Sequence, residues 1–236
     1  MLLACLGVLS APGSVLLSGC GSSPAEDRER IAGRYEYARV LMGTRCRIVV
    51  EAAGEPEAAA ACAAAFERIA ELELVLSDWN PNSEASQLTR LPAGEWHDIS
   101  SDLATALKRS MLVHEASGGA FDPTVAPATR LWRETRRTGQ LPDEADRLDA
   151  VSRIVLEQIE VDGTRVRFDR NGLSLDFGGI GKGMACDEAA AVLRSRGIDA
   201  FLIDFGGDLL AGDAPMGERG WRVAVRDGVG DERAIL

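Results

Sequence analysis

Histidine is scarce in this sequence, which has only His97 and His114 in 236 residues. His97 lies in a polar turn and His114 in an expected helix, so a histidine that activates a serine or cysteine nucleophile is hardly available. We interpret both as structural residues. Close cysteine pairs are lacking as well. The spacing of Cys46, Cys62 and Cys186 excludes a disulfide framework and a zinc site.

Net positive charge is also lacking. The chain has 26 Lys and Arg against 37 Asp and Glu, a formal net charge of −11. A body this acidic is a poor binder of nucleic acids. It also repels anionic phosphate ligands at long range, so a phosphate site would need local cations. Lys182 with a divalent metal ion is the expected source.

The apolar run at the N-terminus is the one candidate for a targeting segment. Residues 1–17 carry no charge, and Leu17-Ser18-Gly19-Cys20 follows. This pattern is typical of a secretory signal and resembles a bacterial lipobox, in which Cys20 is lipidated after cleavage. We expect a lipoprotein signal peptide at 1–19, a lipid-anchored flexible tether at 20–38 and one domain at 39–236. The expected location is the bacterial cell envelope, lipid-anchored on the periplasmic side.

Hydrophobic periodicity predicts an α+β fold with a mixed or antiparallel sheet and packed helices. Alternating apolar residues predict strands at 45–52, 154–161, 165–169, 173–177, 201–205 and 221–226. Helical spacing predicts long helices at 57–76 and 102–115, and another from about 187 to 196. A short helix is expected before Trp132, residues 78–88 read as a polar turn, and 136–149 as surface helix and loop.

The segment from Ser174 to Asp187, SLDFGGIGKGMACD, contains four glycines within six positions and one lysine. Glycines let backbone amides approach a ligand, and a helix N-terminus offers unpaired N–H groups. This favours a phosphate or pyrophosphate site, with Lys182 adding a full charge. The alternative is a tight strand-to-helix turn in which Asp176 caps the helix. The spacing excludes a Walker A loop and fits a dinucleotide fingerprint poorly.

Five clusters lie at the ends of expected strands or helices, and their order resembles that of the ApbE family, the FAD:protein FMN transferases. The clusters are Met42-Gly43-Thr44, SDWNPNSEAS at 77–86, GGAFDPTV at 118–125, DFGGIGKGMACD at 176–187 and Gly206-Gly207-Asp208. The resemblance implies transfer of the FMN half of FAD, with Mg²⁺, to a threonine hydroxyl of a partner protein, releasing AMP. The implied partners are flavoprotein subunits of membrane electron-transfer complexes.

The resemblance also implies roles for individual residues. Asp176 and Lys182 would contact the flavin or its phosphates, and Gly179 would offer its carbonyl to the metal ion. The diphosphate would lie against the glycine-rich bend, with a hollow between the bend and Phe121. No catalytic residue is assigned. The residues expected to line the FAD pocket are Met42, Trp79, Ala120, Phe121 and Asp122.

Family members continue beyond the strand expected at 221–226, with a histidine-containing segment and an Asp/Thr cluster that complete the metal site. We therefore expect this chain to be a C-terminally truncated fragment or a decayed homologue. Two further functions stay open on the same scaffold. One is an FAD pyrophosphatase, in which water replaces the threonine, and the other is a membrane-tethered flavin-binding protein without turnover.

Overall fold

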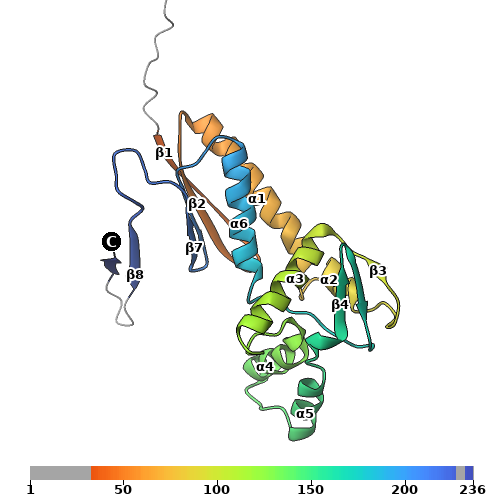
Figure 1. Ribbon diagram of the computed structural model, residues 1–236. Helices are drawn as coiled ribbons and strands as arrows, with labels where there is room; N and C mark the ends of the chain where they lie inside the picture. Colours follow the sequence, from red (N-terminus) through yellow and green to blue (C-terminus); the bar gives the residue numbers. More distant parts are fainter. Residues whose placement is uncertain (1–32, 227–231, 236) are drawn as a thin grey trace, which may run out of the picture. The chain divides into compact units, whose positions relative to one another are not determined.

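The computed structural model describes residues 33–226 and 232–235 (Figure 1). The chain divides into two units, residues 1–31 and 32–236, and every described residue belongs to the second. The predicted signal peptide, Cys20 and the tether up to residue 32 lie outside the described residues. Within the described part, no helix has both the length and the apolar character needed to cross a membrane.

Helices and antiparallel strands make up the described unit, which confirms the predicted α+β class. The strands are β1 (Gly33–Leu41), β2 (Thr44–Ala52), β3 (His97–Asp98), β4 (Ile159–Asp162), β5 (Arg165–Phe168), β6 (Phe201–Phe205), β7 (Asp208–Ala211), β8 (Val223–Arg226) and β9 (Glu232–Ile235). The helices are α1 (Glu55–Leu76), α2 (Glu84–Leu88), α3 (Ser101–Ala116), α4 (Ala126–Thr138), α5 (Glu144–Ser152) and α6 (Gly181–Ser195), with 3₁₀ turns at Pro123–Val125 and Leu156–Gln158.

The main sheet has the order β1-β2-β6-β7, and all its pairs are antiparallel. Its central pair shows why these segments form strands. Ile48 is opposite Ile203, and Val50 is opposite Phe201. These four side chains are fully buried, and Val49 and Leu202 between them are apolar and buried as well. A short continuous apolar run is typical of a strand at the centre of a sheet.

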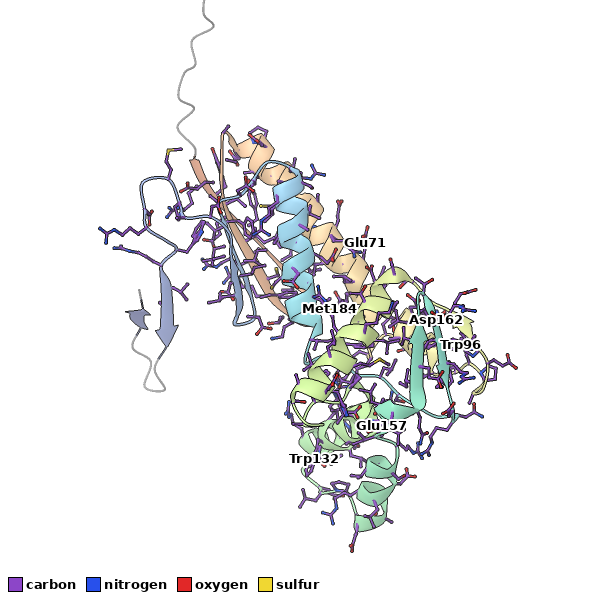
Figure 2. All side chains as sticks on the ribbon, in the orientation of Figure 1. Glu71, Trp96, Trp132, Glu157, Asp162 and Met184 are labelled. Atoms are coloured by element: carbon purple, nitrogen blue, oxygen red, sulfur yellow. The ribbon has the colours of Figure 1, made fainter. Side chains whose placement is uncertain are left out.

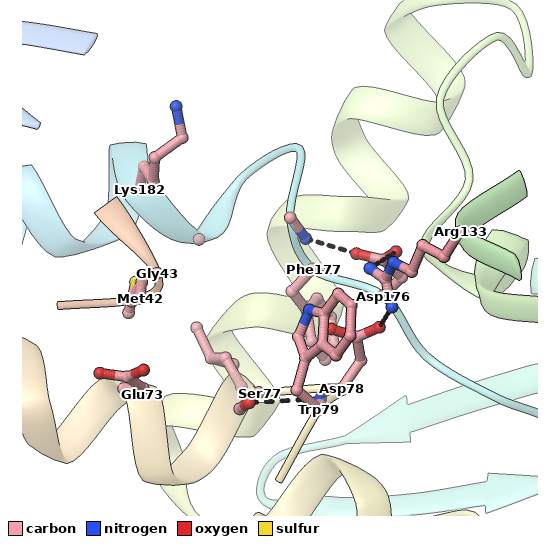
Figure 3. A pocket seen from close by; sticks show the side chains of 13 residues that line it. Met42, Gly43, Glu73, Ser77, Asp78, Trp79, Arg133, Asp176, Phe177 and Lys182 are labelled. Carbon is pink, nitrogen blue, oxygen red and sulfur yellow. Dashed lines mark hydrogen bonds and ion pairs between the residues drawn. The ribbon is translucent and has the colours of Figure 1, made fainter. Parts of the chain in front are cut away.

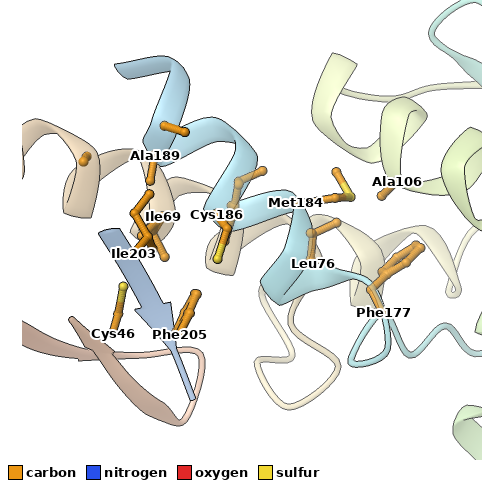
Figure 4. Close-up of a cluster of buried hydrophobic side chains, with 14 of the residues drawn as sticks. Cys46, Ile69, Leu76, Ala106, Phe177, Met184, Cys186, Ala189, Ile203 and Phe205 are labelled. Carbon is orange, nitrogen blue, oxygen red and sulfur yellow. The ribbon is translucent and has the colours of Figure 1, made fainter. Parts of the chain in front are cut away.

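Helices α1 and α6 pack against each other and against the main sheet (Figure 1). Helix α1 buries apolar residues at helical spacing, from Ala58 to Leu76. Three of them are alanines, whose small side chains let two helices approach closely. Figure 4 shows Ile69, Ala189 and Ile203 meeting in the core between the two helices and β6. This packing fixes the end of α1 beside the beginning of α6.

A second group of elements contains α2 to α5 and the small antiparallel sheet β3-β5-β4. Helix α3 begins with Ser100 as its N-cap, whose side chain accepts a hydrogen bond from Leu103 N. Met184 at the start of α6 turns toward Ala106 of α3 (Figure 4), so the buried core is continuous from the main sheet to this group. Trp132 of α4 lies on the outer surface and is largely exposed (Figure 2).

The structure corrects some sequence-based expectations. Residues 33–38 belong to strand β1 rather than to the tether. The expected strand at 173–177 pairs with no strand in the described part of the chain, although all five of its residues are buried. The expected strand at 154–161 begins only at Ile159, after a 3₁₀ turn. The polar segment 78–88 contains helix α2, α4 continues to Thr138, and β7 follows the Gly206-Gly207 turn.

Candidate functional site

A cavity of about 430 Å³ lies where α1 ends and α6 begins (Figure 3). The turn between β1 and β2 and the loop after α1 complete its walls, and α4 contributes Arg133. The lining residues are Met42, Gly43, Glu73, Leu76, Ser77, Asp78, Trp79, Arg133, Asp176, Phe177, Gly178, Gly181 and Lys182. Four of the residues predicted to contact FAD are therefore in one place: Met42, Trp79, Asp176 and Lys182.

The β1–β2 turn brings Met42 to the cavity. The turn has two residues, Met42 with φ 46° and Gly43 with φ 72°. A two-residue hairpin turn with positive φ at both positions matches the right-handed twist of the flanking strands. Glycine adopts this conformation freely, but a non-glycine residue there is strained by about 1–3 kcal/mol. Met42 is held in this conformation in the wall of the cavity.

The glycine-rich bend supplies free backbone donors. Gly181 N and Ile180 N both donate to Phe177 O, at 2.7 and 3.0 Å, which closes the first turn before α6. Within the described residues, the N–H groups of Lys182 and Gly183 have no hydrogen-bond acceptor. The first turn of α6 therefore offers unpaired donors and the positive end of the helix dipole. An anionic group suits this position.

Asp176 holds the bend in place. Its carboxylate accepts hydrogen bonds from Gly178 N at 2.8 Å, Thr129 Oγ1 at 3.0 Å and Arg133 at 3.2 Å. The Asp176 side chain is 10% exposed. Arg133 also donates to Asp78, whose side chain is 8% exposed. One guanidinium thus joins α4, the loop after α1 and the glycine-rich bend through two nearly buried carboxylates.

Trp79 offers a flat apolar surface beside these charges. The Arg133 guanidinium carbon lies 4.1 Å from the centre of the Trp79 ring, which is a cation–π contact. The indole is nevertheless 72% exposed. The loop after α1 holds Trp79 in this position, because the N–H groups of Trp79 and Asn80 donate to Ser77 Oγ. An exposed indole supported by arginine can stack on a planar ring.

Lys182 is paired rather than free. Its Nζ lies 2.9 Å from Asp208 Oδ2 at the start of β7. Two of the predicted clusters, at 176–187 and 206–208, therefore meet at the N-terminus of α6. Cys186 follows on the same helix, but burial raises the pKa of its thiol to about 11. This thiol is therefore not a nucleophile at neutral pH.

The remaining predicted site residues do not line the cavity. Ala120 is exposed in the turn after α3. The Asp122 carboxylate accepts from Thr124 N at 2.7 Å and Thr124 Oγ1 at 2.6 Å, so it caps the 3₁₀ turn. The predicted hollow between the bend and Phe121 is wrong, because a Cβ at Gly179 would lie 2.8 Å from Phe121 Cε2. Phe121 packs against the bend, and the cavity lies toward α1 and the β1–β2 turn.

The donor set for a metal ion is incomplete. Gly179 can contribute a carbonyl oxygen, as the resemblance implied. In residues 33–226 and 232–235, however, no group of three or more His, Cys, Asp or Glu side chains could hold a metal ion. Mg²⁺ prefers about six oxygen ligands in near-octahedral geometry. The described residues do not fit Mg²⁺ by themselves.

Sequence reasoning missed Arg133 and did not single out Asp78 or Glu73. Asp78 lies inside the cluster at 77–86, so its position in that motif could have identified it as a site residue. Arg133 had no such signal, because it lies 43 residues from Asp176 and 55 from Asp78 along the chain. Only the folded arrangement of α4 brings it to the cavity.

The sequence is similar to known proteins. Residues 42–235 match the model of the ApbE family. A FAD:protein FMN transferase of Treponema pallidum is 28% identical over 94% of this chain and 65% of that protein. One of Rhodobacter capsulatus is 34% identical over 94% of this chain and 42% of that protein. The chain thus spans less than two thirds of the length of each of these two relatives.

Solved structures show the same fold. The flavin transferase ApbE from Vibrio cholerae matches with a TM-score of 0.78 and 21% identity, over 86% of this chain and 68% of that one. The apo flavinyl transferase ApbE of Pseudomonas stutzeri matches with a TM-score of 0.77 and 21% identity, over 86% and 66%. Both share the arrangement of helices on an antiparallel sheet.

Proposed function

The chain belongs to the ApbE family, and from this premise we propose that it transfers the FMN half of FAD to an acceptor protein. The relatives from Treponema pallidum and Rhodobacter capsulatus are FAD:protein FMN transferases. We propose further that the acceptor group is a threonine hydroxyl, that AMP is released, and that acceptors are flavoprotein subunits of membrane electron-transfer complexes.

The cavity at the beginning of α6 carries the proposal. It combines unpaired amides of a helix N-terminus, the Lys182 ammonium group and an exposed indole supported by Arg133. The amides and Lys182 suit the diphosphate of FAD, and Trp79 suits a planar ring. FAD has a diphosphate and two planar ring systems, so these features match its chemistry. Each of them is held by contacts within the protein rather than by the ligand.

The proposed reaction is a displacement at the FMN phosphorus. The acceptor oxygen forms a bond to this phosphorus, the bond to the bridging oxygen breaks, and AMP leaves with that oxygen. The hydroxyl proton is released, so atoms and charges balance. Lys182 and the α6 amides would stabilise the charge that develops on the phosphate oxygens. No enzyme nucleophile is needed, which agrees with the high pKa of the Cys186 thiol.

Mg²⁺ dependence is part of the proposal on the strength of the family resemblance. A bound Mg²⁺ ion would neutralise charge on the diphosphate. Since the described residues do not gather a ligand set for it, the roles proposed for Lys182 and the α6 amides do not depend on the metal ion.

We also propose that Cys20 anchors the protein by a lipid to the periplasmic side of the cell envelope. If Cys20→Ala does not move the protein from the membrane fraction to the soluble fraction, the anchor is wrong.

The test supplies FAD, Mg²⁺ and a threonine-bearing flavoprotein subunit, and follows flavin fluorescence on the acceptor together with AMP release. We expect equal amounts of labelled acceptor and AMP. Lys182→Gln should lower the rate, whereas Arg136→Gln, an exposed change on α4, should not. AMP without label would favour the pyrophosphatase. FAD binding without AMP would favour the non-catalytic protein, and neither binding nor AMP would refute the proposal.

A further inference from the structure

A second hollow, of about 340 Å³, adjoins the cavity and shares Asp78 and Trp79 with it. Arg90, which follows α2, and Arg130 of α4 both line this hollow, as does Ser174. We name it the arginine groove. None of these three residues has a role in the binding of FAD proposed above.

The two arginines of the groove are available for a ligand. Within the described residues, neither the Arg90 nor the Arg130 side chain forms a hydrogen bond or an ion pair, whereas Arg133 on the same helix is bound to two carboxylates. Each guanidinium carries five N–H donors. Helix α4 holds four arginines and one glutamate. In a chain with a net charge of −11, this is a local concentration of positive charge.

Ser174 adds a hydroxyl group to the wall of the groove. The residue as a whole is 8% exposed. In the described part of the chain, its hydroxyl forms no hydrogen bond to another protein group, and its oxygen is not among the fully buried atoms that lack a partner. A hydroxyl can donate one hydrogen bond, so a ligand with an oxygen acceptor in the groove could accept it.

Asp78 also lines the groove, and its negative charge would oppose an anion there. That charge is already compensated, because Arg133 donates to the Asp78 carboxylate and the side chain is 8% exposed. The groove therefore presents two free guanidinium groups and a free hydroxyl. This set of donors matches a carboxylate, which arginine binds with two parallel hydrogen bonds.

We propose that the arginine groove binds an acidic side chain of the acceptor polypeptide, next to the hydroxyl that receives FMN. This inference rests on the proposed function. A polypeptide that brings a hydroxyl to the cavity must cross its rim, and the groove shares Asp78 and Trp79 with that rim. The phosphates of FAD have donors of their own at Lys182 and the α6 amides. Because the whole protein repels acidic partners, a local basic site would fix the position of one acidic residue.

The test measures peptide binding through the fluorescence of the protein's tryptophans, since Trp79 lies on the edge of the groove. Two short threonine-containing peptides are compared, which differ only in having aspartates or asparagines beside the threonine. We expect the aspartate peptide to bind about tenfold more tightly, as charge-assisted hydrogen bonds predict. Arg90→Gln with Arg130→Gln should abolish this preference. Both arginines are exposed, so the double variant should fold.

A matched double variant, Arg136→Gln with Arg196→Gln, removes the same charge at exposed positions outside the groove and should keep the preference. Equal binding of the two peptides, or a preference that survives Arg90→Gln with Arg130→Gln, would overturn the proposal. So would weaker FAD binding by that variant, because the anion in the groove would then be the FAD diphosphate. The binding test needs no turnover, so its failure is distinct from a failure to release AMP or to label an acceptor.

Discussion

Replacing Arg133 tests how the candidate site is held together. Its guanidinium donates to Asp78 and Asp176, whose side chains are only 8% and 10% exposed. Removing one partner of a buried ion pair costs about 3–5 kcal/mol. Arg133 itself is 30% exposed, so water can partly replace it, and we expect Arg133→Gln to lower the free energy of unfolding by about 2–3 kcal/mol.

Urea unfolding followed by circular dichroism measures this loss, and the melting temperature should fall by roughly 5–10 °C. Arg136→Gln on the same helix is the control and should change stability by less than about 0.5 kcal/mol. In an Asp78→Asn background, where one unpaired charge is gone, Arg133→Gln should cost clearly less. A loss below about 0.5 kcal/mol, or an equal loss in both backgrounds, would refute the reasoning from paired charges.

Three further predictions concern the rest of the fold. Hydrogen bonds from Arg68 lower the pKa of Asp102, so the pair stabilises the protein above about pH 4 and this contribution is lost as the pH falls through the lowered pKa. Arg68→Gln should cost about 1 kcal/mol at neutral pH in urea unfolding, and a cost that does not shrink as the pH is lowered until Asp102 is protonated would contradict the assignment. A Cβ at Gly212 would lie 2.7 Å from Phe201 Cε1. Gly212→Ala should therefore cost about 1–3 kcal/mol, whereas Gly220→Ala meets no neighbouring atom and should cost far less. Burial raises the pKa of three thiols to about 11 or 12, so a maleimide should leave them unlabelled in the native protein at pH 8, as peptide mapping by mass spectrometry can verify. These thiols are those of Cys46, Cys62 and Cys186.

The sequence predicted well those elements that have one polar and one buried face. Strand β2 and helix α1 show clear periodicity, and their bounds were close to those predicted. Helix α6 ends close to its predicted end but begins at Gly181, well before the predicted start at about residue 187. Strand β1 was missed because Arg34 and Glu36 alternate with Tyr35 and Tyr37, so its composition resembles that of a solvated tether. Pairing with β2 makes it a strand. Such pairing is a long-range contact that local composition does not reveal.

The prediction of a strand at 173–177 was wrong for a different reason. Its sequence alternates as a strand does, but all five residues are buried. Its backbone finds another partner, since Asp176 N donates to Pro123 O at 2.7 Å. Alternation predicts an extended backbone but does not predict a neighbouring strand. The order of motifs has the same limitation. It correctly predicted that Met42, Trp79, Asp176 and Lys182 lie at one site, but it did not predict that Phe121 packs against the bend, outside the cavity.

Asp176 joins the structural and the binding features of the site. A carboxylate has about four lone-pair positions, and three hydrogen bonds already occupy most of them, from Gly178 N, Thr129 Oγ1 and Arg133. Little capacity is left for a direct bond to a ligand. The main effect of Asp176 is therefore to hold the bend from which α6 begins at the wall of the cavity. A ligand bound at the α6 amides depends on Arg133 through Asp176, even if it touches neither side chain.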